Sequence, residues 1–181
     1  DSDEGLHVLR HTSAHVLAQA VKRLYRNVEL GMGTVVENGF YYDFKLDHPL
    51  SSEDLQAIEK EMEHIISENL EIKRIEVSYA EAVKLFQDRG ESFKLDIAKN
   101  IPKDEKLTVY QQGEFVDLCR GPHLPSTSFV KSFKLTRVSG AYWRGDNQNE
   151  VLQRVYGVAF RKKKDLQDHY KFLEEAAKRD H

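Results

Sequence analysis

Two histidines four residues apart, in the stretch His11-Thr-Ser-Ala-His15, have the type and spacing that could do chemistry. In a helix, residues i and i+4 lie one turn apart on the same face, so the two imidazoles would lie side by side. Paired imidazoles can bind a metal, transfer a proton or position a water. Taken alone, the stretch is better interpreted as two solvated histidines on the outer face of a helix, because paired titratable groups are only a probabilistic sign of a site.

The segment Asp117-Leu-Cys-Arg-Gly-Pro-His123 supplies further reactive side chains. On a strand Asp117 and Cys119 share one face, and the Gly-Pro pair breaks the strand before His123. A lone cysteine is usually a small hydrophobe, but here an aspartate and a histidine accompany it. With the histidine pair, this segment completes a His-x-x-x-His and Cys-x-x-x-His set. Its ligand types suit zinc, although the spacing is not that of a standard zinc finger.

Lys94 and Tyr42 are the remaining candidates for a polar pocket able to do hydrolysis. Polar and apolar residues alternate from Glu91 to Ile97, which predicts a strand with Lys94 on its polar face. The default interpretation is a solvated lysine on an edge strand. Tyr42 follows the Asn38-Gly39 pair, which predicts a tight hairpin turn. Tyr42 would lie on the strand leaving that turn, where plain core packing is the alternative.

The elements that position these residues follow from hydrophobic periodicity and turn signals. Apolar residues at helical spacing predict a helix from about Glu4 to Tyr25, and capping signatures begin two more helices at Ser51 and Ser78. Alternation and turn residues predict strands and hairpins over residues 28–44, 72–77, 107–120 and 151–160. The expected fold class is α+β, a mainly antiparallel sheet with hairpins packed around the N-terminal helix.

Residues 161–181 form a charged helix in this prediction, with only a thin apolar stripe. A helix this polar is better interpreted as a linker to another domain than as part of a core. The predicted organisation is therefore one domain over residues 1–160, followed by a linker helix over residues 161–181.

Composition excludes several classes of protein. The 181 residues are 40% hydrophobic and 31% charged, as in an ordinary folded domain. No apolar run approaches the ~18 residues of a membrane span, and no signal peptide is visible. The single cysteine excludes an internal disulfide and predicts a cytoplasmic location. Because the net charge is only −3, any contact with nucleic acid would be local, at basic clusters such as residues 131–137 and 161–164.

Five motifs, in this order, resemble the editing domain of bacterial threonyl-tRNA synthetases. Each motif alone is weak, but all five in order, across nearly the whole chain, are highly specific. A related module with the paired histidines and the Cys-x-x-x-His motif occurs in alanyl-tRNA synthetases and free-standing deacylases, and the last motif favours the threonyl branch. The motifs are His11-Thr-Ser-Ala-His15, Asn38-Gly-Phe-Tyr-Tyr-Asp43, Arg89-Gly-Glu-Ser-Phe-Lys94, Asp117-Leu-Cys-Arg-Gly-Pro-His123 and Gly140-Ala-Tyr-Trp-Arg-Gly-Asp146.

The resemblance implies proofreading: hydrolysis of the ester in seryl-tRNA(Thr), with threonyl-tRNA(Thr) spared. Such a second site is needed because a pocket shaped for threonine cannot exclude serine, whose missing methyl gives only ~1 to 3 kcal/mol of discrimination. The implied partners are the serine-carrying acceptor end of tRNA(Thr) and the rest of the synthetase chain. ATP would be used only by the class II catalytic domain, which does not fit within these residues, so the chain is expected to charge no tRNA.

The resemblance also carries roles onto matching positions. His11 and His123 would position the attacking water, while Lys94 would stabilise the oxyanion or anchor the substrate. Asp117 would orient a histidine or hold the serine ammonium. Tyr42 would contact the adenosine or the seryl group, and small walls near Gly39 would reject the methyl of threonine. The catalytic set is thus His11, Lys94, Asp117 and His123. The substrate-binding set is His15, Gly39, Tyr42 and Cys119.

No cofactor is expected for this editing reaction. The alanyl relatives bind zinc at the equivalent positions, so the candidate ligands, if zinc is present, are His11, His15, Cys119 and His123. The threonyl branch is instead expected to use a water without metal. The alternatives left open are a zinc-dependent misacyl-tRNA deacylase of the alanyl type, covalent catalysis by Cys119, a structural zinc domain and a tRNA-binding module without catalysis.

Overall fold

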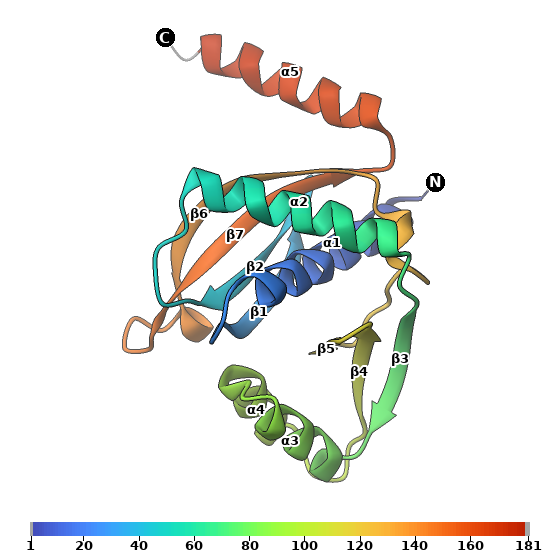
Figure 1. Cartoon of the computed structure of the whole chain (residues 1–181), viewed down its shortest axis with the longest axis vertical. Helices are drawn as coiled ribbons and strands as arrows, with labels where there is room; N and C mark the ends of the chain where they lie inside the picture. Colours follow the sequence, from blue (N-terminus) through green and yellow to red (C-terminus); the bar gives the residue numbers. More distant parts are fainter. Residues whose placement is uncertain (1, 180–181) are drawn as a thin grey trace.

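Two antiparallel sheets and one central helix make up the architecture in the computed structural model, which describes residues 2–179 (Figure 1). One sheet has the strand order β1-β2-β7-β6 and the other β3-β4-β5. The predicted α+β class and antiparallel pairing are confirmed. In chain order the helices and strands are α1 (Asp3–Leu24), β1 (Glu29–Val36), β2 (Gly39–Lys45), α2 (Ser52–Glu68), β3 (Ile72–Val77), α3 (Tyr79–Asp88), α4 (Ser92–Lys99), β4 (Leu107–Gln112), β5 (Phe115–Leu118), β6 (Ser132–Tyr142), β7 (Val151–Phe160) and α5 (Lys163–Arg179).

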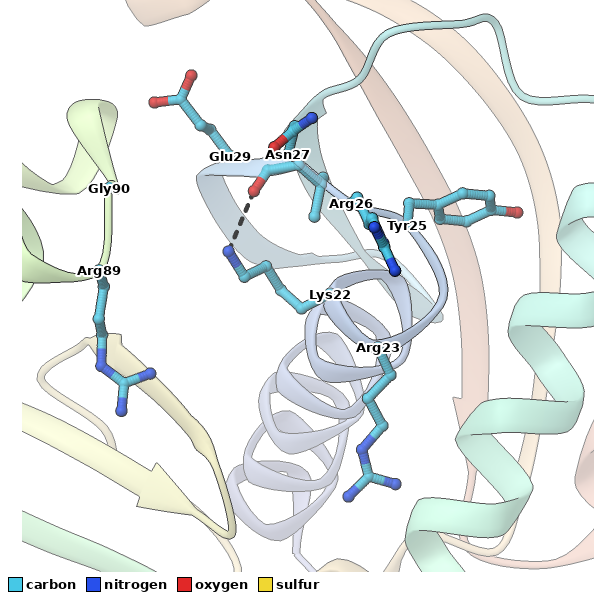
Figure 2. Close-up of a pocket in the computed structure, with 9 residues that line it drawn as sticks. Lys22, Arg23, Tyr25, Arg26, Asn27, Glu29, Arg89 and Gly90 are labelled. Atoms are coloured by element: carbon cyan, nitrogen blue, oxygen red, sulfur yellow. Dashed lines mark hydrogen bonds between the residues drawn. The ribbon is translucent and has the colours of Figure 1, made fainter.

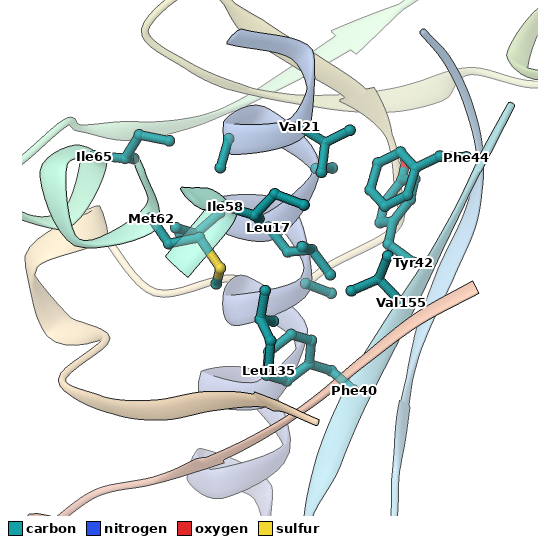
Figure 3. Packing of buried hydrophobic residues seen from close by; sticks show 14 of the residues in the cluster. Leu17, Val21, Phe40, Tyr42, Phe44, Ile58, Met62, Ile65, Leu135 and Val155 are labelled. Atoms are coloured by element: carbon teal, nitrogen blue, oxygen red, sulfur yellow. The ribbon is translucent and has the colours of Figure 1, made fainter. Parts of the chain in front are cut away.

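The main core lies between α1, α2 and the four-stranded sheet. Leu17 and Val21 of α1 pack against Ile58 and Met62 of α2 on one side and against aromatic side chains of β2 on the other (Figure 3). From Leu9 to Val21 nearly every residue of α1 is buried. A helix that is buried all round has neighbours on every face, and the second sheet covers the face that the sequence suggested was open to solvent.

The predicted hairpins form as expected. Asn38 adopts the left-handed conformation, with φ of 63°, in the turn between β1 and β2. β4 and β5 form the second hairpin, and β3 pairs with the far edge of β4. The last strand, β7, is inserted between β2 and β6, so the four-stranded sheet is joined by segments more than 100 residues apart.

The strand predicted for Glu91 to Ile97 is wrong, because Ser92–Lys99 is the helix α4. The side chains of Phe93 and Ile97, which share a face in a strand, also share a face four residues apart in a helix. Phe93 packs edge-on against Trp143 at 4.9 Å between ring centroids, and α3 lies beside α4. The hydrophobic pattern of these eight residues fits either a helix or a strand, and the tertiary packing selects the helix.

The charged C-terminal segment is the helix α5, and none of its side chains is buried. Its contacts are with β6 and β7, at the side of the molecule away from β3, β4 and β5 (Figure 1). Within residues 2–179, no helix combines the length and the apolar character needed to cross a membrane.

Candidate active site

The histidine pair lies on the face of α1 that meets the three-stranded sheet. The ring centroids of His11 and His15 are 5.5 Å apart. The His15 ring packs edge-on against Phe115 of β5, with centroids 5.6 Å apart. His15 is only 3% exposed, whereas His11 is half-buried. The interpretation as two solvated histidines is therefore wrong for His15.

Asp117, on β5, is a buried carboxylate that contacts three predicted site residues. Its Oδ2 accepts a hydrogen bond of 2.6 Å from the Tyr42 hydroxyl and lies 3.1 Å from His15 Nε2. Its Oδ1 lies 2.8 Å from Lys94 Nζ, an ion pair whose angles do not satisfy hydrogen-bond geometry. Because Asp117 and Lys94 are 2% and 3% exposed, this pair is shielded from solvent. Helix α4 thus directs Lys94 inward, not onto a solvated strand face.

The charges of this buried network support one another. Burial alone would raise the pKa of Asp117, but the neighbouring Lys94 and His15 outweigh it and hold that pKa well below its ordinary value. Burial would lower the pKa of His15, but Asp117 and the Cys119 sulfur raise it to about 9. Burial, followed by the charge of Asp117, raises the pKa of Tyr42 well above its usual range. At neutral pH the network therefore contains a carboxylate, an imidazolium and a neutral phenol.

Cys119 lies among the three histidines. Its Sγ is 3.4 Å from His11 Nε2 and 3.2 Å from His123 Nε2. Burial would raise the pKa of this thiol, but the hydrogen bonds from the histidines and the charge of His15 lower it to about 4. Burial and the charge of His15 lower the pKa of His123, also to about 4. At neutral pH Cys119 is therefore a thiolate and His123 a neutral imidazole.

The position of His123 depends on residues that the sequence analysis missed. Thr12 Oγ1 lies 3.1 Å from His123 Nδ1 and accepts the backbone N–H of Leu124, also at 3.1 Å. The Tyr110 ring packs edge-on against His123, with centroids 4.5 Å apart. Gly121 has φ of +74°, and a Cβ there would collide with the Tyr110 ring. The one indication in the sequence that Thr12 belongs to the site was its position inside the motif His11-Thr-Ser-Ala-His15.

These residues surround a single cavity of about 700 Å³. Tyr42 lies behind the cavity wall, under Asp117, and His123 lies behind Cys119. Gly39 does not reach the cavity; it packs against the Gly157 carbonyl in the four-stranded sheet. Gly33 of β1 lines the cavity instead, and a Cβ there would collide with the Tyr42 ring. The site residues that line the cavity directly are His11, His15, Lys94, Asp117 and Cys119.

The donor set also fits a metal ion. One ligand atom from each of His11, His15, Cys119 and His123 lies within 4.8 Å of all the others. With Nε2 of His15 facing Asp117, its buried Nδ1 has no hydrogen-bond partner among the described residues. Three imidazoles and a thiolate are ligands that zinc accepts in a tetrahedral site.

A second hollow, also of about 700 Å³, lies near the end of α1 and the turn that follows α3 (Figure 2). Its lining is basic, and three of its four cations, Lys22, Arg23 and Arg89, already have partners in the described part of the chain. Lys22 contacts the Val28 carbonyl and Glu91, and Arg23 binds three glutamates. None of the predicted catalytic residues lines this hollow.

Part of the chain matches a known family of tRNA synthetase domains. Residues 107–156, which include β4, β5, Asp117, Cys119 and His123, match the family described as the threonyl and alanyl tRNA synthetase second additional domain.

Along its whole length the chain is similar to threonine--tRNA ligases, which confirms the resemblance drawn from its motifs. It is 72% identical over 181 residues to threonine--tRNA ligase 2 of Bacillus subtilis. It is 58% identical over 180 residues to the threonine--tRNA ligase of Oceanobacillus iheyensis and 55% identical over 181 residues to that of Geobacillus kaustophilus. These alignments cover 99 to 100% of this chain and 28% of each relative, so the chain spans little more than a quarter of their length.

Proposed function

We propose that this chain hydrolyses the ester bond of mischarged seryl-tRNA(Thr) and spares threonyl-tRNA(Thr). The convergence of an imidazole pair, a buried lysine–aspartate pair and a thiolate on one cavity supports this proposal. Similarity to threonine--tRNA ligases supports a tRNA ester as the substrate. The partners in this proposal are the acceptor end of tRNA(Thr) and the rest of a longer synthetase chain, acting in the cytoplasm.

In the proposed reaction a water attacks the carbonyl carbon of the seryl ester. His11, half-buried at the cavity wall, accepts a proton from that water. Neutral His123, which lies behind Cys119, holds the Cys119 sulfur in place beside His11 and so acts on the water only indirectly. The tetrahedral intermediate then expels the ribose oxygen, which takes the proton back from His11. The products are serine and a tRNA with a free ribose hydroxyl. General acid–base catalysis of this kind contributes about 10²–10⁴-fold.

Lys94 and His15 would stabilise the negative charge that develops on the carbonyl oxygen. Both line the cavity, and both are already oriented by Asp117. Fixed charges in a site shielded from water stabilise an oxyanion without reorganising during the reaction. Tyr42 is 1% exposed and bonded to Asp117, so its proposed role is to support the carboxylate and not to touch the substrate.

The selectivity against threonine is proposed to arise from steric exclusion. The side chains around Asp117 are almost fully buried and hydrogen-bonded or ion-paired, so they cannot move aside for an extra methyl. Overpacking of a rigid site costs about 1–3 kcal/mol. Because Gly39 lies outside the cavity, the walls that reject the methyl would be those of β1, α4 and β5.

We further propose that the reaction needs no metal. If zinc were bound by the four donors, it would polarise the carbonyl or activate the water, as in an alanyl-type deacylase. Elemental analysis and chelation distinguish the metal-free reaction from the zinc-dependent one. One tightly held zinc per chain, with activity lost on chelation and restored by zinc, would favour the alanyl-type reaction.

The proposal is tested by incubating the 181-residue chain with labelled seryl-tRNA(Thr) and threonyl-tRNA(Thr). Serine should be released far faster than threonine. His11→Ala and Lys94→Met should lose this activity, while His7→Ala and Lys99→Met, exposed residues on the same two helices, should retain it. Circular dichroism checks that each variant is folded. Binding of tRNA without release of serine would instead indicate a module that only binds RNA.

A further inference from the structure

The solvent side of the catalytic cavity carries three exposed cations. We call Arg74, Lys106 and Arg120 the mouth cations, because all three line the cavity and are exposed, while the catalytic groups beneath are largely buried. Arg74 comes from β3, Lys106 immediately precedes β4, and Arg120 follows Cys119. The proposed hydrolysis gives these residues no role.

Strand register places Arg74 on the same face of the sheet as Asp117. Arg74 is paired with Tyr110 across β3 and β4, and Tyr110 is paired with Asp117 across β4 and β5. Partners directly opposite each other point to the same face, and neighbouring strands are about 4.8 Å apart, so Arg74 lies about 10 Å along the sheet from Asp117. The guanidinium is held by a 3.3 Å hydrogen bond to Thr108 Oγ1.

The mouth cations are available to bind an anion. Arg120 has no carboxylate within ion-pair distance among residues 2–179. Arg74 and Lys106 both approach Glu76, at 3.5 and 3.9 Å, but these groups are more than half exposed. Exposed ion pairs of this kind are weak because water screens them, so an anionic ligand can replace them. Glu105 also lines the cavity and is the one carboxylate that would oppose such a ligand there, apart from Asp117.

We propose that Arg74, Lys106 and Arg120 bind the phosphodiester that precedes the terminal nucleoside of the substrate. This inference rests on the proposed function, which holds the ester carbonyl beside Lys94 and His15. The phosphate on the other side of the same ribose then lies outward, toward the exposed end of the cavity. Arginine is suited to this contact, because its planar guanidinium binds phosphate oxygens in pairs.

The decisive experiment compares substrates with and without the phosphate. The 181-residue chain is given seryl-tRNA(Thr) and the seryl ester of adenosine, which has no phosphate. Arg74→Gln and Arg120→Gln should each lower kcat/KM for seryl-tRNA by at least about tenfold, the effect of one lost charge-assisted hydrogen bond. The same variants should hydrolyse seryl-adenosine at the wild-type rate. Arg26→Gln, an exposed arginine outside the cavity, serves as the matched control.

A second measurement does not depend on hydrolysis. Adenosine 5′-monophosphate should bind the wild-type chain more tightly than adenosine, and this difference should vanish in Arg74→Gln and Arg120→Gln. Glu76→Gln should have the opposite effect and strengthen binding of the monophosphate, because it releases two of the mouth cations. The advantage of the phosphate should also decrease as salt is added.

Each result has a distinct meaning. Equal loss on both substrates would show that the arginines act on the fold or the chemistry and would overturn the phosphate assignment. Unchanged hydrolysis of both substrates, or equal affinity for monophosphate and adenosine, would overturn it as well. If the wild-type chain hydrolysed neither ester yet bound the monophosphate through these arginines, the proposed hydrolysis would fail and the phosphate site would stand.

Discussion

Replacing Asp117 by asparagine should expose how much the buried charge network contributes to stability. The substitution keeps the shape of the side chain but removes the negative charge beside Lys94 and His15. Leaving one partner of a buried ion pair without the other costs about 3–5 kcal/mol, so Lys94 alone gives a loss of this order at every pH at which it is charged.

The contribution of His15 adds a dependence on pH. Its folded pKa of about 9 is above its ordinary value of 6.5, so protonation of His15 stabilises the fold fully below pH 6.5. This contribution is lost as the pH rises through 9. The gap between the two pKa values corresponds to about 3 kcal/mol, because each pH unit is ~1.36 kcal/mol. Because the Cys119 sulfur supplies part of this rise, Asp117→Asn should destabilise the chain by up to about 3 kcal/mol more at pH 6 than at pH 9.5.

Urea unfolding at the two pH values measures this difference, with Asp47→Asn, an exposed carboxylate, as the control. The control should stay within about 0.5 kcal/mol of the wild type. A nuclear magnetic resonance titration of the His15 ring should show its pKa falling well below 9 in the variant. Equal destabilisation at both pH values, or a His15 ring that still titrates near 9, would refute the reasoning.

Three further outcomes are expected. The Cys119 thiol should react with iodoacetamide with an apparent pKa of about 4, because the histidines stabilise its thiolate; an inflection near 9 would contradict this. Glu91→Gln keeps an acceptor for the backbone N–H of Leu30 in β1 but loses the ion pair with Lys22. The free energy of unfolding, measured by calorimetry, should therefore fall by about 1–3 kcal/mol. Glu91→Asp, which keeps the charge, should lower it less. Gly121→Ala should destabilise by more than about 1 kcal/mol, since φ is positive and Tyr110 occupies the space; a neutral result would show that the loop can relax.

Much of the fold could be predicted from the sequence because its signals are local. Ser51 and Ser78 begin helices with both hydrogen bonds of a capping box, as their sequence signatures predict. Asn38 turns the first hairpin. The helix α4 could not be predicted in this way. Glu91, at its start, makes no side-chain cap, and eight residues are too few to distinguish the hydrophobic period of a helix from that of a strand.

The site was harder to predict than the fold, because its contacts are long-range. His11, His15, Lys94, Asp117 and Cys119 line one cavity, whereas no residue of the motif at 140–146 lines it. The burial of His15 and Lys94 depends on a sheet that no periodicity in α1 or α4 reveals. Thr12 was overlooked because a threonine on a helix has no distinctive spacing. Gly39 was assigned to the pocket from its neighbours in sequence, whereas Gly33, which lies opposite Tyr42 on the hairpin, lines the cavity.

The insertion of β7 between β2 and β6 has a consequence for synthesis of the chain. Until Phe160 has left the ribosome, β2 exposes one edge of unpaired backbone groups, and β6 has no partner in its sheet. Such open edges invite pairing with other chains, and closing them requires contacts across more than 100 positions, which form slowly. All the side chains proposed to be catalytic are translated by His123, yet the sheet that supports Tyr42 is completed only some 37 residues later. Maturation of this domain is therefore governed by its final strand.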